Sequence, residues 1–184
     1  MGALIKAGQP LPAERQAASE QQQYLTFVLG GEMFAIGILC VKEIIEYGHL
    51  TVVPMMPDCI RGVINLRGAV VPVVDLACRF GRRSTELTRR TCIVIVEIEA
   101  EGERQDIGVI VDAVSEVLEI QDGQIEPPPA FSARIRTDFI HGMGKVEGNF
   151  VIILNVNKVL SLDDLALLGQ MAGQESMDAL TAAA

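Results

Sequence analysis

The stretch Arg61-Gly-Val-Ile-Asn-Leu-Arg-Gly-Ala-Val-Val-Pro-Val-Val-Asp-Leu76 places a short polar turn between two apolar runs. A similar stretch, His141-Gly-Met-Gly-Lys-Val-Glu-Gly-Asn-Phe-Val-Ile-Ile-Leu-Asn-Val156, follows 80 residues later. Three positions carry matching residue types in the two stretches: Gly62 and Gly142, Gly68 and Gly148, and Asp75 and Asn155. A repeat of this kind predicts a duplicated module, here a hairpin bracketed by glycines.

The repeat extends upstream, where 35–46 resembles 108–119 at an offset of 73 residues. At this offset Glu43 aligns with Glu116, and Pro54 aligns with Pro127. Each half is therefore expected to run from apolar strands through a glutamate-bearing segment and a Pro-marked loop to a hairpin. Chance similarity between two β-rich sequences remains the alternative.

The composition favours β-structure. The chain has 184 residues, of which 49% are hydrophobic but only 4% aromatic, and it has no Trp. The core must then consist mostly of Val, Ile and Leu, and β-branched residues favour strands. No apolar run approaches the ~18 residues of a membrane span, and the N-terminus has no convincing signal-peptide core. We expect a cytoplasmic protein without direct membrane insertion.

The charge is unevenly distributed along the chain. The net charge is −9; residues 24–90 carry eight Lys/Arg and six Asp/Glu, whereas residues 91–165 carry five and fourteen. An acidic chain with few aromatics is a poor nucleic-acid binder, because phosphate contacts need clustered Lys and Arg. The one exception is a basic cluster, which we interpret as a solvated linker rather than a site for phosphate contacts; it comprises Arg79, Arg82, Arg83, Arg89 and Arg90.

The sequence offers no catalytic or metal-binding motif. The cysteines at 40, 59, 78 and 92 form no C-x-x-C pair, and only two histidines are present as possible further ligands. Neither His49 nor His141 lies in a pattern typical of a nucleophilic triad. We therefore expect no enzymatic activity, no cofactor and no metal.

Several local patterns predict particular elements. Residues 38–47 favour a short helical turn leading into a strand that carries Glu43. Pro72 lies inside the predicted strand 69–76, which indicates an edge strand or a bulge. Ser161 followed by early acidic residues predicts the start of a C-terminal helix.

The domain prediction follows from these patterns. We expect a mobile arm over 1–22, one domain over 23–168, and a frayed tail over 169–184. Within the domain, subdomain one covers about 23–90, subdomain two about 91–160, and a helix begins at about 161.

Residues 23–168 resemble the CheW-like domain family of bacterial chemotaxis coupling proteins. The resemblance rests on the motifs Val41-Lys-Glu-Ile-Ile45, Arg61-Gly-Val-Ile-Asn-Leu-Arg-Gly68, Val71-Pro-Val-Val-Asp-Leu76 and Ile107-Gly-Val-Ile-Val-Asp112. It implies a mainly β fold of two SH3-like five-stranded barrels that share a core, with short helices. It also implies an adaptor without enzymatic activity, recruited to membrane-associated receptor arrays.

The resemblance further implies two partners. One barrel surface would dock the regulatory domain of the histidine kinase CheA, through Val41, Glu43, Ile44 and Arg67. The groove between the barrels would grip the cytoplasmic tip of a methyl-accepting chemoreceptor. The residues implied for receptor binding or coupling are Gly62, Asn65, Arg67, Cys92, Ile93, Val94 and Gly108.

Elementary chemistry is consistent with some of these roles. Val41 and Ile44 can form an exposed apolar patch, which is the usual centre of an interface. Arg67 on a Gly-flanked turn can donate two parallel hydrogen bonds to a partner carboxylate. An internal ion pair between Glu43 and Arg67 is the alternative.

Two other functional hypotheses remain open. The same adaptor role in a non-flagellar pathway, such as one that controls type IV pili, would use the same architecture. A small β-barrel enzyme or ligand-binding protein would need a polar cluster in the groove between the barrels, and the sequence offers none that is convincing.

Overall fold

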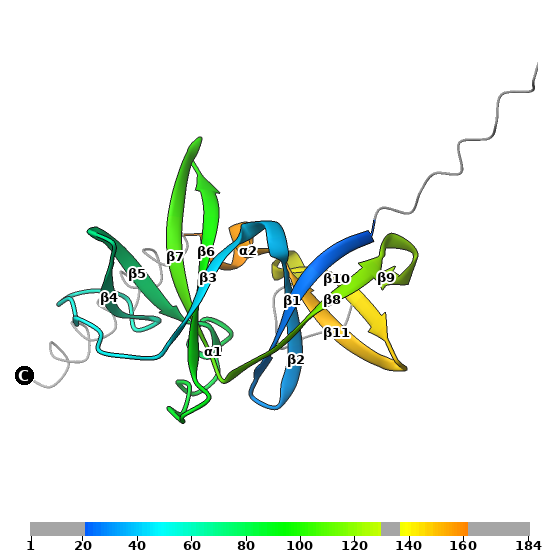
Figure 1. Cartoon of the computed structure of the whole chain (residues 1–184), viewed down its shortest axis with the longest axis horizontal. Helices are drawn as coiled ribbons and strands as arrows, with labels where there is room; N and C mark the ends of the chain where they lie inside the picture. The colour runs from blue at the N-terminus through cyan, green and yellow to red at the C-terminus, as the bar shows by residue number, and fades with distance from the viewer. Residues whose placement is uncertain (1–20, 130–136, 162–184) are drawn as a thin grey trace, which may run out of the picture.

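The computed structural model describes residues 21–129 and 137–161, which are mainly β-strands as expected (Figure 1). The elements, with η for 3₁₀ turns, are β1 (Gln21–Leu29), β2 (Glu32–Gly37), η1 (Ile38–Cys40), β3 (Val41–Glu46), β4 (Ile60–Leu66), β5 (Ala69–Asp75), α1 (Leu76–Arg79), β6 (Cys92–Ala100), β7 (Glu103–Val111), β8 (Ala113–Gln121), η2 (Asp122–Gln124), β9 (Ile125–Glu126), η3 (Thr137–Phe139), β10 (Ile140–Val146), β11 (Asn149–Leu154) and α2 (Val156–Val159). The predicted C-terminal helix and tail, and most of the predicted arm, lie outside the described residues. Gln21 and Gln22, expected in the arm, already belong to β1.

The strands form two sheets that lie side by side in Figure 1. One sheet has the order β8-β1-β2-β11-β10-β9, and the other has the order β3-β6-β7-β5-β4. Each sheet therefore takes strands from both halves of the chain. The predicted boundary near residue 90 does not separate the two sheets, and the charge difference between 24–90 and 91–165 does not correspond to one sheet or the other.

The structure bears out the internal repeat. Hairpin β4–β5 and hairpin β10–β11 lie at the same place in their sheets, and each pairs in parallel with a strand from the other half of the chain. The register shifts at equivalent points, between Ile60 and Gly62 and between Ile140 and Gly142. Asp75 and Asn155, which align in the repeat, both cap the short helix that follows the hairpin.

Four hairpins turn through two central residues that both have positive φ. The turn residues are Gly30 and Gly31, Arg67 and Gly68, Glu101 and Gly102, and Glu147 and Gly148. This backbone matches the right-handed twist of the flanking strands, and it favours glycine at one or both positions. Glycines at these turns are thus a local signal that fixes where each strand ends.

Strand β3 does not pair directly with β4, and β8 does not pair directly with β10. Instead, a segment that follows one edge strand reaches the opposite edge: Thr51 bridges Val63 of β4, and β9 pairs with β10. Gly62 and Gly142 lie at these contacts. A Cβ on Gly62 would lie 2.5 Å from the Thr51 carbonyl oxygen, and one on Gly142 would lie 2.4 Å from Ile125 Cγ2. These glycines permit the close approach that curls each sheet toward a barrel.

The interior contains three apolar clusters. A cluster within the six-stranded sheet includes Tyr24 and Ile120, and a second within the five-stranded sheet includes Ile93 and Ile95. The largest lies between the sheets and includes Val94 and many residues from both sheets and both helices. Alternate residues of β6 therefore serve different clusters, which explains why this strand is apolar on both faces. The expected shared core is present.

The expectation for Pro72 is wrong. Strand β5 is internal, between β4 and β7, and the irregularity in its pairing with β4 lies at Arg61 rather than at Pro72. Pro72 is opposite Val63, whose N–H and carbonyl both bond to Thr51. The pairing of β5 with β7 begins only at Val73. The missing N–H of Pro72 therefore removes no ladder hydrogen bond.

Candidate docking surfaces

An ion pair joins the two edges of the five-stranded sheet. Arg67, in the β4–β5 turn, places Nη2 2.7 Å from Oε2 of Glu43 on β3. Arg67 adopts φ 53°, and Asn65 Oδ1 accepts a 2.8 Å hydrogen bond from the Gly68 N–H, which fixes the turn. The Arg67 side chain nevertheless remains 79% exposed. The internal pair that we considered as an alternative is thus present, and most of the guanidinium can still meet a partner.

A bulge in β3 brings Val41 and Ile44 onto the same face. The register between β3 and β6 shifts at Lys42, so that Val41 lies opposite Val96 and Ile44 lies opposite Val94. Val41 is half-buried against the shared core, whereas Ile44 is 43% exposed. Without the bulge, residues three apart would point to opposite faces. The predicted apolar patch is therefore present, but Ile44 supplies most of its exposed area.

Lys42, at the bulge, forms two ion pairs that connect β3 to the β6–β7 hairpin. Its Nζ lies 2.8 Å from Asp106 Oδ1 and 3.0 Å from Glu97 Oε2. The hydrogen bond to Asp106, and then the one to Glu97, raise the pKa of the Lys42 ammonium. These contacts fix the edge strand that carries Glu43 and Ile44.

Three residues implied for receptor binding are buried. Ile93 and Val94 are no more than 1% exposed, and Gly108 lies in the interior, where an added Cβ would meet Ile93 Cγ2 at 2.8 Å. None of them can touch a partner in this structure, because each faces an apolar cluster. They must be reassigned to the core. Cys92 remains partly exposed at the start of β6, with its thiol donating to the Arg90 carbonyl.

The predicted basic cluster is not a single surface. Arg79 is buried, donates from Nε to the Val159 carbonyl at 2.8 Å, and lies over the Phe139 ring. Arg82 pairs with Glu32 at 2.7 Å, beside the β1–β2 turn. At least these two arginines therefore have structural roles.

A groove of about 760 Å³ lies where the chain crosses between the sheets. It is lined by the first residues of β1, by η1, and by the junction of β11 and α2. Leu39 in η1 is 101% exposed at this groove, and His141 also lines it. Sequence reasoning did not identify this surface. Its only local signal is a pair of apolar residues, Ile38 and Leu39, in a turn.

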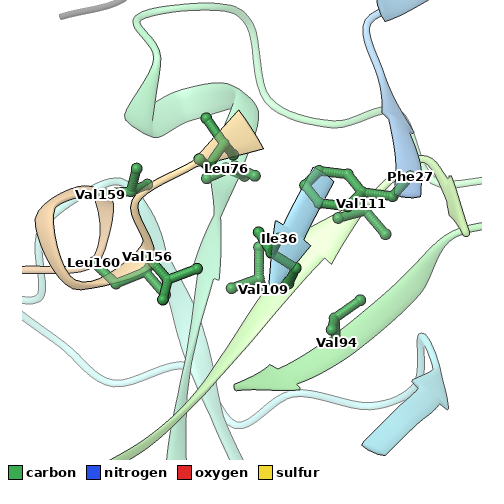
Figure 2. A pocket seen from close by; sticks show the side chains of 10 residues that line it. Phe27, Ile36, Leu76, Val94, Val109, Val111, Val156, Val159 and Leu160 are labelled. Atoms are coloured by element: carbon green, nitrogen blue, oxygen red, sulfur yellow. The ribbon is translucent and has the colours of Figure 1, made fainter. Parts of the chain in front are cut away.

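A small apolar cavity lies at the contact between the two sheets. Its volume is about 10 Å³, and the side chains around it are all apolar, as Figure 2 shows. This volume is at the lower limit for one water molecule. In the described parts of the chain, no group of three or more His, Cys, Asp or Glu residues could hold a metal ion. Helices long and apolar enough to cross a membrane are likewise absent from these parts.

Comparison with known proteins gives a consistent result. The family profile of the CheW-like domain matches residues 23–164. The chain belongs to the CheW-like domain family. Chemotaxis protein CheW of Klebsiella aerogenes is 35% identical over 151 residues, which cover 82% of this chain and 89% of that protein. Chemotaxis protein CheW of Rhizobium meliloti is 30% identical, over 83% of this chain and 96% of that protein.

A solved structure supports the same family. The crystal structure of scaffolding protein TtCheW from Thermoanaerobacter tengcongensis superposes with a TM-score of 0.68 at 37% identity. The match covers 76% of this chain and 87% of TtCheW. The CheW-like domain thus includes both sheets and both surfaces described above.

Proposed function

We propose that this protein is a non-enzymatic scaffold in chemotaxis that couples methyl-accepting chemoreceptors to the histidine kinase CheA. The observation that carries the proposal is the match of residues 23–164 to the CheW-like domain. The names of the similar proteins, chemotaxis protein CheW and scaffolding protein TtCheW, support it.

We assign the kinase to the surface formed by β3 and the β4–β5 turn. This surface carries the exposed apolar side chain of Ile44 on one face of β3 and, on the other face, the guanidinium of Arg67 paired with Glu43. Arginine is one of the residue types that most often dominate the binding energy of an interface. The equivalent positions in the other sheet hold Glu116 and Glu147, which cannot form such a pair. The proposed kinase surface is therefore specific to the five-stranded sheet.

We assign the receptor tip to the groove at the crossover between the sheets. The tip is helical in the proteins that this family couples, and an apolar groove suits the apolar face of a helix. Leu39 would supply the main apolar contact. Arg67, in the β4–β5 turn, is not among the residues that line the groove, and we expect both partners to bind at once.

The experiment is reconstitution with CheA and a receptor cytoplasmic fragment from the same organism. We expect kinase activity to rise only when all three components are present. Arg67→Glu should weaken CheA binding at least tenfold. The matched control is Arg104→Glu, since Arg104 has the same 79% side-chain exposure and also pairs with a glutamate. Equal loss in both variants would contradict the assignment of the kinase surface.

The receptor surface has its own pair of variants. Leu39→Asp should abolish capture by the receptor fragment and leave CheA binding unchanged, because a carboxylate cannot be buried unpaired in an apolar contact. Met55→Asp is the control, because Met55 is 102% exposed in a distant loop. If the wild-type protein binds neither CheA nor the receptor fragment, the proposed function itself is wrong.

A further inference from the structure

Two cysteine thiols meet at the edge of the shared core. Cys59 precedes β4 and Cys78 lies in α1, and their Sγ atoms are 2.7 Å apart. Both side chains are partly exposed, so a small molecule in solution can reach them. The other two cysteines bond to backbone carbonyls instead: Cys40 to Gly37 and Cys92 to Arg90.

The backbone holds the two thiols together through a shared residue, Asp75. The Asp75 N–H donates to the Cys59 carbonyl at 2.7 Å, and Asp75 Oδ1 accepts from the Cys78 N–H at 3.4 Å. Asp75 is itself fully buried and accepts two further bonds from Thr85. The proximity of the thiols is therefore a property of a fixed backbone rather than of a loose loop.

The internal repeat shows that the fold does not need these thiols. The equivalent positions in the second copy are Phe139 and Lys158. The backbone bond is nevertheless the same there, since the Asn155 N–H donates to the Phe139 carbonyl at 2.8 Å. The thiol pair is thus an addition to one copy of an architecture that forms without it.

We propose that Cys59 and Cys78 are a redox-modification site, which forms an intramolecular disulfide by exchange with a low-molecular-weight disulfide. One protein thiol loses its proton to solvent, and the thiolate attacks a sulfur of oxidised glutathione, which releases one glutathione thiolate. The second protein thiol then loses its proton to solvent, and its thiolate attacks the protein sulfur of the mixed disulfide and releases the second glutathione thiolate; both glutathione thiolates take up a proton from solvent. The protein dithiol is oxidised by two electrons, and oxidised glutathione is reduced to two thiols.

The surroundings of the pair govern how fast this exchange occurs. Burial, and then the hydrogen bond with Cys78, raise the pKa of the Cys59 thiol to about 12. Asp75 acts in the same direction, whereas Arg79 opposes it. Cys59 therefore stays protonated at neutral pH. Protonation makes the exchange slow and protects the Cys59 thiol from irreversible oxidation. The disulfide would close a loop that contains the whole β4–β5 hairpin, including Arg67.

The test uses the full chain equilibrated with mixtures of reduced and oxidised glutathione. Samples are quenched with acid, then unfolded and alkylated near neutral pH, and analysed by mass spectrometry. We expect two of the four thiols to resist alkylation, and a peptide that links Cys59 to Cys78. Oxidation of this pair should require at least tenfold less oxidised glutathione than loss of any other thiol. Thermal unfolding of the oxidised protein should occur several degrees above that of the reduced protein.

Variants identify the pair. Cys59→Ser and Cys78→Ser should each leave all remaining thiols open to alkylation, whereas Cys40→Ser and Cys92→Ser should retain the protected pair. Glutathione adducts or intermolecular dimers without a linked Cys59–Cys78 peptide would overturn the proposal. The wild-type measurement needs neither a variant nor a partner, so its result is independent of the coupling experiments.

Discussion

At the scale of the residue, Glu43 and Arg67 illustrate how one contact can be structural and still serve recognition. The pair joins opposite edges of one sheet, yet an exposed ion pair contributes only about 0.2–1 kcal/mol to stability. Its larger effect is to orient a guanidinium that remains mostly in solvent. Direct binding by Arg67 and orientation by Glu43 are therefore separable roles.

A charge swap separates these two roles. Arg67→Glu alone places two carboxylates together and should cost about 1 kcal/mol of unfolding free energy. The double variant Glu43→Arg, Arg67→Glu should recover that stability, measured by urea unfolding. CheA binding should stay weak in the double variant, because the partner still meets a carboxylate where the guanidinium was. Recovery of binding together with stability would instead show that the internal pair alone matters.

Among the secondary-structure elements, the two short helices α1 and α2 occupy equivalent places in the two copies of the repeat, and their capping residues differ. Asp75 caps α1 and accepts from the backbone of Ala77, Cys78 and Thr85 as well as from the Thr85 hydroxyl. Asn155 caps α2 and accepts from the Lys158 N–H at 3.3 Å. Both copies have the cap. Of the two capping residues, only Asp75 is fully buried, and it also accepts hydrogen bonds from Thr85 in the loop that leads to β6.

Alanine substitutions should measure this difference. Asp75→Ala would leave the buried N–H of Thr85 without its acceptor and should cost about 2–4 kcal/mol. Asn155→Ala removes an ordinary helix cap at a half-buried position and should cost about 1 kcal/mol. Urea unfolding of both variants checks the order. Equal costs would show that the network around Asp75 adds nothing to its role as a cap.

At the scale of the whole molecule, the shared core binds the two sheets into one unit. Four phenylalanines form a chain through it, with ring centroids 6.0 Å apart for Phe27 and Phe34, 5.6 Å for Phe34 and Phe80, and 6.3 Å for Phe80 and Phe139. Arg79 of α1 adds a hydrogen bond to α2. Since each sheet also contains strands from both halves of the chain, neither half can complete a sheet alone.

The cooperativity of unfolding tests this organisation. Phe34→Ala should lower the unfolding free energy by about 3–5 kcal/mol, because Phe34 is fully buried between two other rings. Phe150→Ala is the control, since its ring is half exposed, and it should change stability by no more than about 0.5 kcal/mol. Circular dichroism and hydrogen exchange in β5 and β11 should report one transition. Two separate transitions in Phe34→Ala would show that the sheets fold independently.

Local signals in the sequence predicted much of the local structure. The hairpin at Gly30, the helical turn before Glu43 and the matching hairpins of the repeat all depend on neighbouring residues, and the structure contains them. The expectation for Pro72 fails because an internal strand tolerates proline just before its pairing with a neighbour begins, and the neighbour here, β7, is distant in the chain. Ile93, Val94 and Gly108 were misplaced because an apolar strand looks the same whether it faces a partner or two cores.

The β class, the duplicated module, the turns and the family follow from the residues alone, because each depends on residue types at short or regular spacing. Three features appear only in the folded chain: the two copies exchange hairpins, Glu43 pairs with Arg67, and Cys59 contacts Cys78. These contacts join residues that are distant in the chain, and they depend on how sheets twist and pack against each other. No local pattern encodes such contacts, since they arise from the shape of the complete fold.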